Sequence, residues 1–353
     1  YVDDDTLVLN RTPFYAESGG QIGDTGTVTG GGVTIDVTDT RYGVPGIHVH
    51  EISGSGGLEA GQVVTATIDD DRRSAIRRNH TATHILHHAL REVLGEHVKQ
   101  QGSYVGPDRL RFDFSHYEGL TPEQIAEIED RVNAEVLDNG ACRHFETTME
   151  TAEQLGAIAF FGDKYGDVVR VLEAGRNSVE LCGGTHVKRT GDIGLFYITT
   201  ESAVSSGVRR IEALTGPNAL AHLMNQNEVL QDVASILKSS PSETVERVKS
   251  LAAERKKLEQ EISTLRRQLA KGGGSSSNDE SDFKDIGGIK FTSRVLDGFP
   301  PKDLKPMADD LKSSIGSGVV ALIATNEGKA SVVVGVTDDL TDNEWLQLFE
   351  NGL

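Results

Sequence analysis

Four residues in two distant segments have the types and the spacing of a metal site. His80 and His84 lie in RRNHTATHILHHALREVL, where a spacing of four places both imidazoles on one helix face, one turn apart. Cys182 and His186 lie in ELCGGTHV, where the two glycines let the backbone turn tightly enough for both side chains to point at one centre. Three imidazoles and one thiolate form a ligand set that suits tetrahedral Zn²⁺. The sequence therefore predicts a zinc site.

Other chemistries have less support from the same stretches. Thr81 stands where a zinc protease of the His-Glu-x-x-His type needs its general-base glutamate. No Ser-His-Asp arrangement and no phosphate-binding P-loop is visible in the sequence. His87 and His88 follow on the same helix, and we expect them beside the site or at the surface. Cys142 has no partner at ligand spacing and is expected to be an inert structural thiol.

The two ligand pairs need a mixed framework of helices and strands. Residues 1–71 alternate apolar and polar positions between glycine-rich turns, which predicts a small antiparallel β-barrel. Residues 72–215 mix helices at about 74–95 and 122–139 with strands such as VVRVLEA, SVELC and GLFYITTE, while LRFDFSH reads as a strand that could line the same cavity. We expect an α+β fold whose second segment carries all four ligands.

Beyond this segment the hydrophobic period becomes helical. Apolar positions recur at steps of three and four through residues 216–271, interrupted by Ser240-Pro241-Ser242-Glu243, which has the form of a capping box with proline at its first helical position. This predicts a helical hairpin whose apolar seams face each other or a partner. KGGGSSSNDES then indicates a flexible linker over 272–282, and 283–353 reads as a small β-α-β-β domain.

Composition restricts the class of protein. The chain has 353 residues, which suits two or three domains, and its two widely spaced cysteines cannot form a disulfide framework. We therefore expect a reducing, cytoplasmic compartment. The longest apolar run, residues 319–324, is too short to span a membrane. The chain opens on Tyr1 directly in a strand-like stretch, and we expect an N-terminal part to be absent.

The charge is strongly acidic but unevenly spread. A net charge of −19 argues against nucleic acid as a partner only when it is read as an average. Residues 72–91 carry no acidic side chain, and they carry five arginines, namely Arg72, Arg73, Arg77, Arg78 and Arg91. These side chains form either a patch that steers a polyanion toward the metal or a solvated helix flank.

Four motifs in this order resemble a known family. HTATH, then CGGTH about a hundred residues later, with RTPFYAESGGQIGDTG before them and SSGVRRIEALTG after them, resemble the editing domain of bacterial-type alanyl-tRNA synthetases. The resemblance is dense over about the first 215 residues and covers the helical arm and the C-terminal segment in outline. Threonyl-tRNA synthetase editing domains share the metal pairs but are not expected to carry TPFYAESGGQ. The glycine-rich stretch expected after the last hairpin is missing, so we expect a partial C-terminal domain.

The resemblance implies hydrolysis of the ester that joins serine or glycine to the 3′ end of alanine tRNA. A pocket built for alanine rejects glycine or serine by only about 1–3 kcal/mol, so a second, hydrolytic site is needed to remove the errors. The implied cofactor is Zn²⁺ and the implied partner is alanine tRNA, with no membrane and with possible self-association through the helical arm. ATP binding and alanylation would belong to a synthetic domain that this sequence does not contain.

The resemblance also implies roles for residues around the metal. Thr83 would recognise the serine hydroxyl, or would bond back to its own helical turn. Gln100, in HVKQQGS, would orient the attacking water, because an amide is not a strong base. Arg209 would contact the tRNA backbone or the terminal adenosine, or would form a core salt bridge. A loop formed by Gly19, Gly20 and Gln21 would meet the acceptor stem, or would be a plain β-turn.

Two other functions stay open. The zinc could stabilise a tRNA-binding module that has no catalytic activity, because four protein ligands fill a tetrahedral site. The chain could also be a stand-alone trans-editing protein, although such relatives usually depart from AES in the first motif.

Overall fold

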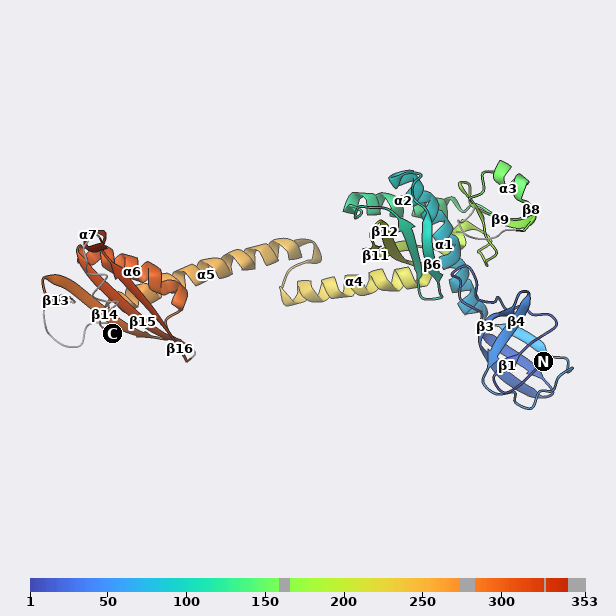
Figure 1. Cartoon of the computed structure of the whole chain (residues 1–353), viewed down its shortest axis with the longest axis horizontal. Coiled ribbons are helices and arrows are strands. Elements are labelled where there is room, and N and C mark those ends of the chain that lie inside the picture. Colours follow the sequence, from blue (N-terminus) through green and yellow to red (C-terminus); the bar gives the residue numbers. More distant parts are fainter. Residues whose placement is uncertain (159–165, 273–282, 327, 342–353) are drawn as a thin grey trace. The chain divides into compact units, whose positions relative to one another are not determined.

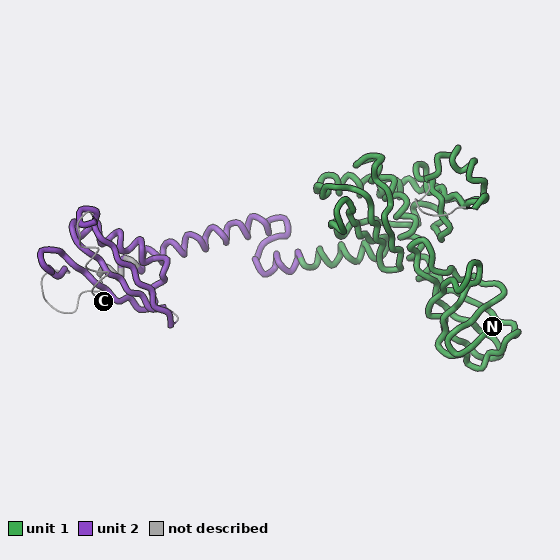
Figure 2. Tube along the Cα trace, viewed as in Figure 1, with its two compact units in different colours: residues 1–229 green, residues 230–353 purple. Residues whose placement is uncertain are grey.

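The computed structural model describes residues 1–158, 166–272, 283–326 and 328–341. The chain divides into two compact units, Tyr1–Val229 and Leu230–Leu353, which Figure 2 colours separately. The predicted linker and the final DNEWLQLFENGL lie almost wholly outside the described residues. None of the helices in the described ranges combines the length and apolar character that crossing a bilayer would require.

The N-terminal segment forms a five-stranded antiparallel sheet with the order β1-β4-β3-β2-β5 (Figure 1). Its strands are β1 (Thr6–Leu7), β2 (Gly26–Gly30), β3 (Val33–Val44), β4 (Ile47–Ile52) and β5 (Thr65–Ile68). Alternate side chains such as Val28, Ile35 and Val37 form its core, as the sequence pattern predicted. The predicted barrel was wrong, because within residues 1–71 the edge strands β1 and β5 do not pair. These edges have only two and four residues, which leaves little strand length for closure.

The next segment is α+β, as predicted. Its helices are α1 (Asp70–Leu94), α2 (Pro122–Asp138), α3 (Met149–Gln154) and the 3₁₀ turn η1 (Thr190–Ile193). One antiparallel sheet has the order β11-β12-β7-β6, from Phe196–Ser205, Val208–Thr215, Leu110–Ser115 and Gln100–Val105. The other has the order β10-β9-β8, from Ser178–Leu181, Val168–Ala174 and Cys142–Thr148. Strands β6, β8 and β12 were not among the predicted strands.

Helix α1 is the central element of this segment. Asp69 caps its first turn by accepting a hydrogen bond from the Arg72 backbone amide, and Gly95 ends it. The middle of the helix is buried against the main core, which includes Phe112, Phe114 and Phe196. A polar side chain on this stretch needs internal hydrogen-bond partners, because burial removes its water. The histidines of α1 are therefore held in fixed positions.

A buried ion pair joins the loop before β2 to α1. The Arg73 guanidinium donates to both carboxylate oxygens of Asp24 and to the Pro13 carbonyl oxygen at 2.9 Å. The Asp24 carboxylate also accepts from the Tyr15 backbone amide at 2.6 Å. Both charged side chains are almost completely buried. This network fixes the loop that contains Tyr15 against the start of α1.

Other arginines of the predicted basic patch have structural partners as well. Arg72 donates to the Gly23 carbonyl oxygen at 2.8 Å. Arg91 donates to the carbonyl oxygens of Glu96 and Val98 at 3.0 and 3.1 Å. With Arg73 already paired, three of the five arginines hold the fold together, so the sequence overstated the free positive charge on this helix.

The remaining helices begin with α4 (Gly216–Ile236), within which the two compact units divide. Helix α5 (Thr244–Gly272) follows the 3₁₀ turn η2 (Pro241–Glu243). The predicted capping box is present: Ser240 and Glu243 are its two members, with Pro241 at the first helical position. The sequence therefore identified the place where one helix stops and the next one starts.

The C-terminal sheet confirms the predicted β-α-β-β order and adds one short strand. Its order is β13-β14-β15-β16, from Lys284–Ile286, Ile289–Asp297, Gly318–Asn326 and Lys329–Val336. Strands β14 and β15 are parallel and are connected by α6 (Pro301–Ile315), which buries Leu304, Met307 and Leu311 against the sheet. A short helix, α7 (Asp338–Thr341), ends the described chain.

The buried ion pair generates a stability prediction. Asp24→Ala should lower the free energy of unfolding by about 3–5 kcal/mol, because it leaves the Arg73 guanidinium buried without its carboxylate. Urea unfolding followed by circular dichroism measures this loss. Asp36→Ala, at an exposed position of β3, is the control carboxylate and should change little. Equal stability of the two variants would contradict the role that we assign to the pair.

Candidate metal centre

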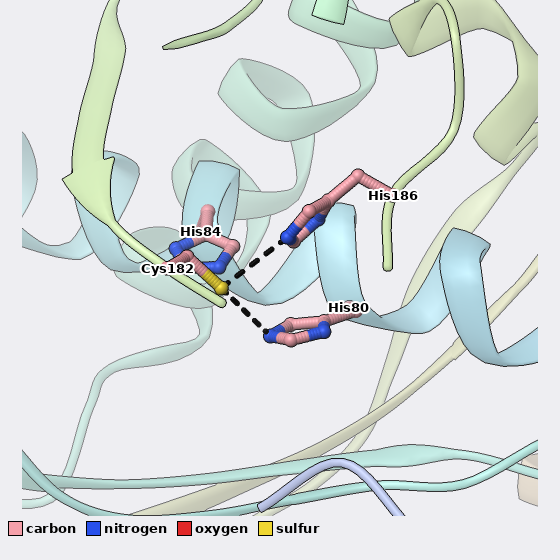
Figure 3. Close-up of side chains that lie close together, drawn as sticks. All are labelled: His80, His84, Cys182 and His186. Carbon is pink, nitrogen blue, oxygen red and sulfur yellow. Dashed lines mark hydrogen bonds between the residues drawn. The ribbon is translucent and has the colours of Figure 1, made fainter. Parts of the chain in front are cut away.

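The four predicted ligands converge in the structure. One donor atom from each of His80, His84, Cys182 and His186 lies within 4.8 Å of the others. The Cys182 Sγ is 3.5 Å from His80 Nε2 and 3.2 Å from His186 Nε2 (Figure 3). Figure 3 shows the Cys182 sulfur beside the His84 ring, with dashed lines from it to His80 and His186. A single ion can therefore contact all four side chains.

The loop after β10 needs its second glycine to reach this position. A Cβ atom on Gly184 would lie 2.1 Å from Cε1 of His80, whereas a Cβ on Gly183 would meet nothing within 4 Å. Arg170 braces the same loop, because its Nη1 donates to the carbonyl oxygens of Cys182 and Gly184 at 3.2 and 2.6 Å. The close approach of backbone and imidazole is therefore the physical reason for glycine at 184.

Each imidazole is oriented through its Nδ1 atom. His80 Nδ1 donates to the Gln21 Oε1 atom at 2.7 Å, and His84 Nδ1 donates to the carboxylate of Glu180. His186 Nδ1 lies 3.3 Å from the Thr81 hydroxyl oxygen. The Thr81 hydroxyl gives its own hydrogen to the Arg77 carbonyl oxygen at 3.0 Å, so it accepts from His186. Each Nδ1 is thus occupied, which directs the three Nε2 atoms toward the metal position.

Gln21 lies at the metal centre. It is fully buried, and its amide group also accepts from the Thr185 backbone amide and donates to the Thr185 hydroxyl, both at 2.9 Å. Of the other predicted loop residues, Gly20 has a φ of +85° and abuts Ser103, while Gly19 lines the cavity described below. The sequence reasoning missed that Gln21 orients His80. A contact of the loop with the tRNA acceptor stem stays a prediction.

The electrostatics of the cluster favour the ligand forms of two side chains. Burial raises the pKa of Cys182, but the three nearby histidines outweigh burial and lower it well below its usual value. Burial and His80 together lower the pKa of His186 to about 3. A thiolate and a neutral imidazole are the forms that bind a metal ion.

The pKa of His84 is shifted in the opposite direction from that of His186. Burial lowers the pKa of this histidine, but Glu180 and Cys182 outweigh it and raise the pKa to about 10. Because Nδ1 donates to Glu180, a metal ion would take the place of the proton at Nε2. Metal binding at this histidine would therefore release a proton.

A cavity of about 530 Å³ opens beside the cluster. Its lining includes Thr83 and Gln100 together with His80, His84 and Cys182, so the structure places the two proposed catalytic side chains beside the candidate metal ligands. The Thr83 hydroxyl donates to the Asn79 carbonyl oxygen at 2.8 Å, which is the helix bond considered as an alternative. The Gln100 Nε2 lies 3.3 Å from the Ser103 hydroxyl oxygen.

Arg209 is placed differently from these two residues. Its guanidinium forms a forked ion pair with Glu201, at 2.6 and 2.7 Å, and it does not line this cavity. The geometry is that of the salt bridge considered as an alternative. A contact between Arg209 and tRNA stays a prediction.

The sequence reasoning missed several residues of the site, including Glu180, Arg170 and Tyr15. Glu180 precedes Cys182 by two residues at the end of a strand, so strand alternation was the signal that could have found it. The neighbouring histidines lie where we expected, since His87 is buried against Glu180 and His88 is partly exposed beside Glu92. Burial raises the pKa of Cys142 to about 11, as expected of an unreactive thiol.

The two glycines of the loop provide a matched test of this geometry. Gly184→Ala should weaken divalent-metal binding at least about tenfold, because its methyl group would displace the His80 imidazole. Gly183→Ala should leave the affinity close to that of the parent chain. Competition with a chromophoric chelator measures both affinities, and two unchanged values would contradict the close approach of this loop to α1.

Two family models match parts of the chain. A model described as "Threonyl and Alanyl tRNA synthetase second additional domain" matches residues 169–212, which include Cys182 and His186. A model described as "tRNA synthetases class II (A)" matches residues 1–72. The first match contains the loop that supplies half of the metal cluster.

Curated relatives match nearly the whole chain. An alanine-tRNA ligase of Chelativorans sp. (strain BNC1) is 49% identical over 348 residues, and one of Parvibaculum lavamentivorans is 50% identical over 350 residues. These alignments cover 95% and 96% of this chain but only 39% of each relative. One of Cereibacter sphaeroides (strain ATCC 17023) is 49% identical over 350 residues, with the same 39% of its length covered. Over the part that it matches, the chain therefore belongs to the alanine-tRNA ligase family.

Proposed function

We propose that this part of the chain hydrolyses alanine tRNA that has been mischarged with serine or glycine. The observation that carries the proposal is the cavity in which Thr83 and Gln100 meet the metal cluster. Such a pocket, beside polar groups of fixed orientation, is a common form of active site. The relatives' name describes the ligation of alanine to tRNA. We propose that this activity needs segments outside this chain, because the chain spans about 39% of their length.

Zinc is the metal that we propose for the cluster. Thiolate sulfur is a poor ligand for Mg²⁺ or Ca²⁺, and three imidazoles with one thiolate suit a tetrahedral zinc ion. The imidazoles donate their Nδ1 hydrogens to Gln21, Thr81 and Glu180, and such outer hydrogen bonds are typical of histidines that hold a metal ion. Zinc bound there would supply a fixed positive centre that holds the substrate end in place.

Thr83 and Gln100 divide the work of recognition and hydrolysis in this proposal. The Thr83 hydroxyl donates its hydrogen to the Asn79 carbonyl oxygen, so toward the cavity it can only accept, and the hydroxyl of a seryl group is a suitable donor. The Gln100 side chain places the attacking water against the ester by hydrogen bonding. Glycine has no hydroxyl, so only the second contact serves both substrates.

Charged groups are proposed to hold the tRNA. Arg170 lines the cavity and has one end of its guanidinium tied to the metal-bearing loop, which suits it to face a phosphate of the 3′ end. Arg209 is a second proposed contact, although its ion pair with Glu201 competes with any phosphate.

Self-association through the helical arm is a further proposal. On α5, apolar side chains such as Leu258, Ile262 and Leu265 are exposed and could pack against a second copy of the arm.

A zinc-stabilised tRNA-binding module without catalysis is the second candidate function. It is favoured by the ligand count, because four protein ligands leave no open position on a tetrahedral ion. Purified chain mixed with seryl-tRNA decides between the two candidates. An editor releases free serine, whereas a binder retains the ester. Activity of the isolated chain would also fit a protein that edits in trans.

The metal assignment gives the first prediction of this proposal. Purified protein should contain about one equivalent of zinc by elemental analysis, and Cys182→Ser should lose most of it, because the thiolate is the only anionic ligand in the cluster. Cys142→Ser, at the other cysteine, is the matched control and should retain the metal. Full zinc occupancy in a His84→Ala, Cys182→Ser double variant would contradict the assignment of these side chains as zinc ligands.

The roles proposed for Gln100 and Thr83 give the second prediction. Gln100→His should keep zinc and tRNA affinity but slow seryl-tRNA hydrolysis roughly ten- to a thousandfold, because one positioning contact is lost. Thr83→Val should slow the seryl ester more than the glycyl ester. Single-turnover deacylation with both substrates measures these rates. Unchanged rates in both variants would mean that other groups in the cavity do the chemistry.

A further inference from the structure

Glu180 is a carboxylate buried beside the cluster, and its side chain is 1% exposed. It lies on β10 and accepts from two imidazoles of α1 at once: one oxygen from His84 Nδ1, the other from His87 Nδ1 at 2.8 Å. Neither histidine partner is a surface group, since both are also buried. A fully buried carboxylate is costly unless a positive charge balances it.

A metal ion in the cluster would supply the positive charge that balances the Glu180 carboxylate. A zinc ion carries two positive charges, three neutral imidazoles add none, and the Cys182 thiolate removes one. The cluster would therefore keep one positive charge in a buried site. The Glu180 carboxylate, one imidazole away through His84, would cancel it.

We propose that Glu180 is the counter-charge and positioning residue of the metal centre, and that His87 holds Glu180 in place for this task. The carboxylate fixes the His84 ring so that its Nε2 faces the metal. His87 packs against the Phe112 ring, with ring centres 5.3 Å apart, so it ties the carboxylate to the main hydrophobic core. The orientation of a metal ligand is thereby set by the core of the domain rather than by the ion alone.

The chemistry of the amide makes Glu180→Gln the decisive variant. Two carboxylate oxygens accept from both Nδ1–H groups, whereas glutamine offers one oxygen and one NH₂ group. One histidine must then lose its hydrogen bond or move its proton to Nε2. In His84 that change would place a proton where the metal binds, and the counter-charge is lost as well.

The test measures metal binding of the full chain without tRNA, so it is independent of hydrolysis. Zinc affinity is determined by chelator competition, and the visible spectrum of the Co²⁺-loaded protein reports the ligand geometry. Glu180→Gln should weaken zinc binding about 10–100-fold and alter the Co²⁺ spectrum. Glu135→Gln removes another carboxylate that accepts two hydrogen bonds, at 2.8 and 2.9 Å, on α2; this control should behave like the parent chain.

Variants of the adjacent histidines separate the anchor from general packing. His87→Ala should weaken zinc binding by a smaller factor and add little to Glu180→Gln in the double variant, because both act through one carboxylate. His88→Ala, at the next and partly exposed position, should have no effect. Parent-like zinc affinity and an unchanged Co²⁺ spectrum in Glu180→Gln overturn the proposal. If that variant does not fold, parent-like affinity in His87→Ala overturns it instead.

Discussion

The structure depends on bringing four donor atoms from two distant segments to one point. His80 and Cys182 are 102 positions apart in the chain, yet their donor atoms lie 3.5 Å from each other. Loop-closure entropy opposes such a meeting, and the ion that satisfies the donors would offset part of that cost. Helix α1 supplies a rigid turn for one pair, and the loop after β10 supplies a backbone close enough for the other.

The surroundings of the cluster connect every layer of the first unit to this point. The loop between β1 and β2 contributes Gln21, which reaches His80, and the Asp24–Arg73 pair fixes the same loop against α1. The sheet β10-β9-β8 contributes Glu180, which lies on β10. A change in any of these elements is therefore expected to shift the side chains of the cluster and to alter metal affinity. The same packing creates the cavity, because the N-terminal loop, α1 and β6 form three of its walls.

Local patterns predicted the parts of this site that depend on spacing along the chain. The four side chains of the cluster, α1, α2 and the capped turn at Ser240 were all visible as spacing or as end signals. The structure confirms the helices and the turn, and it brings the four side chains together. The predicted barrel failed because strand closure depends on pairing between strand edges that are distant in sequence. The basic patch was overestimated for a related reason. A count of arginines does not show that Arg73 faces Asp24 across 49 positions.

The outer hydrogen bonds illustrate what spacing alone could and could not supply. Strand alternation could have indicated Glu180, two residues before Cys182, but the sequence reasoning missed it. Nothing local could show that one carboxylate would meet both His84 and His87. In the same way, Gln21 belongs to a glycine-rich turn by sequence and to the metal centre by structure. Tertiary contacts decide such roles, because buried polar groups take whichever partners the fold presents.

X-ray absorption at the zinc edge of the purified protein tests the central claim most directly. We expect one zinc ion with a single sulfur neighbour at about 2.3 Å and three nitrogen neighbours at about 2.0–2.1 Å. A first shell without sulfur, or one with several sulfurs, would contradict the convergence of α1 with the loop after β10.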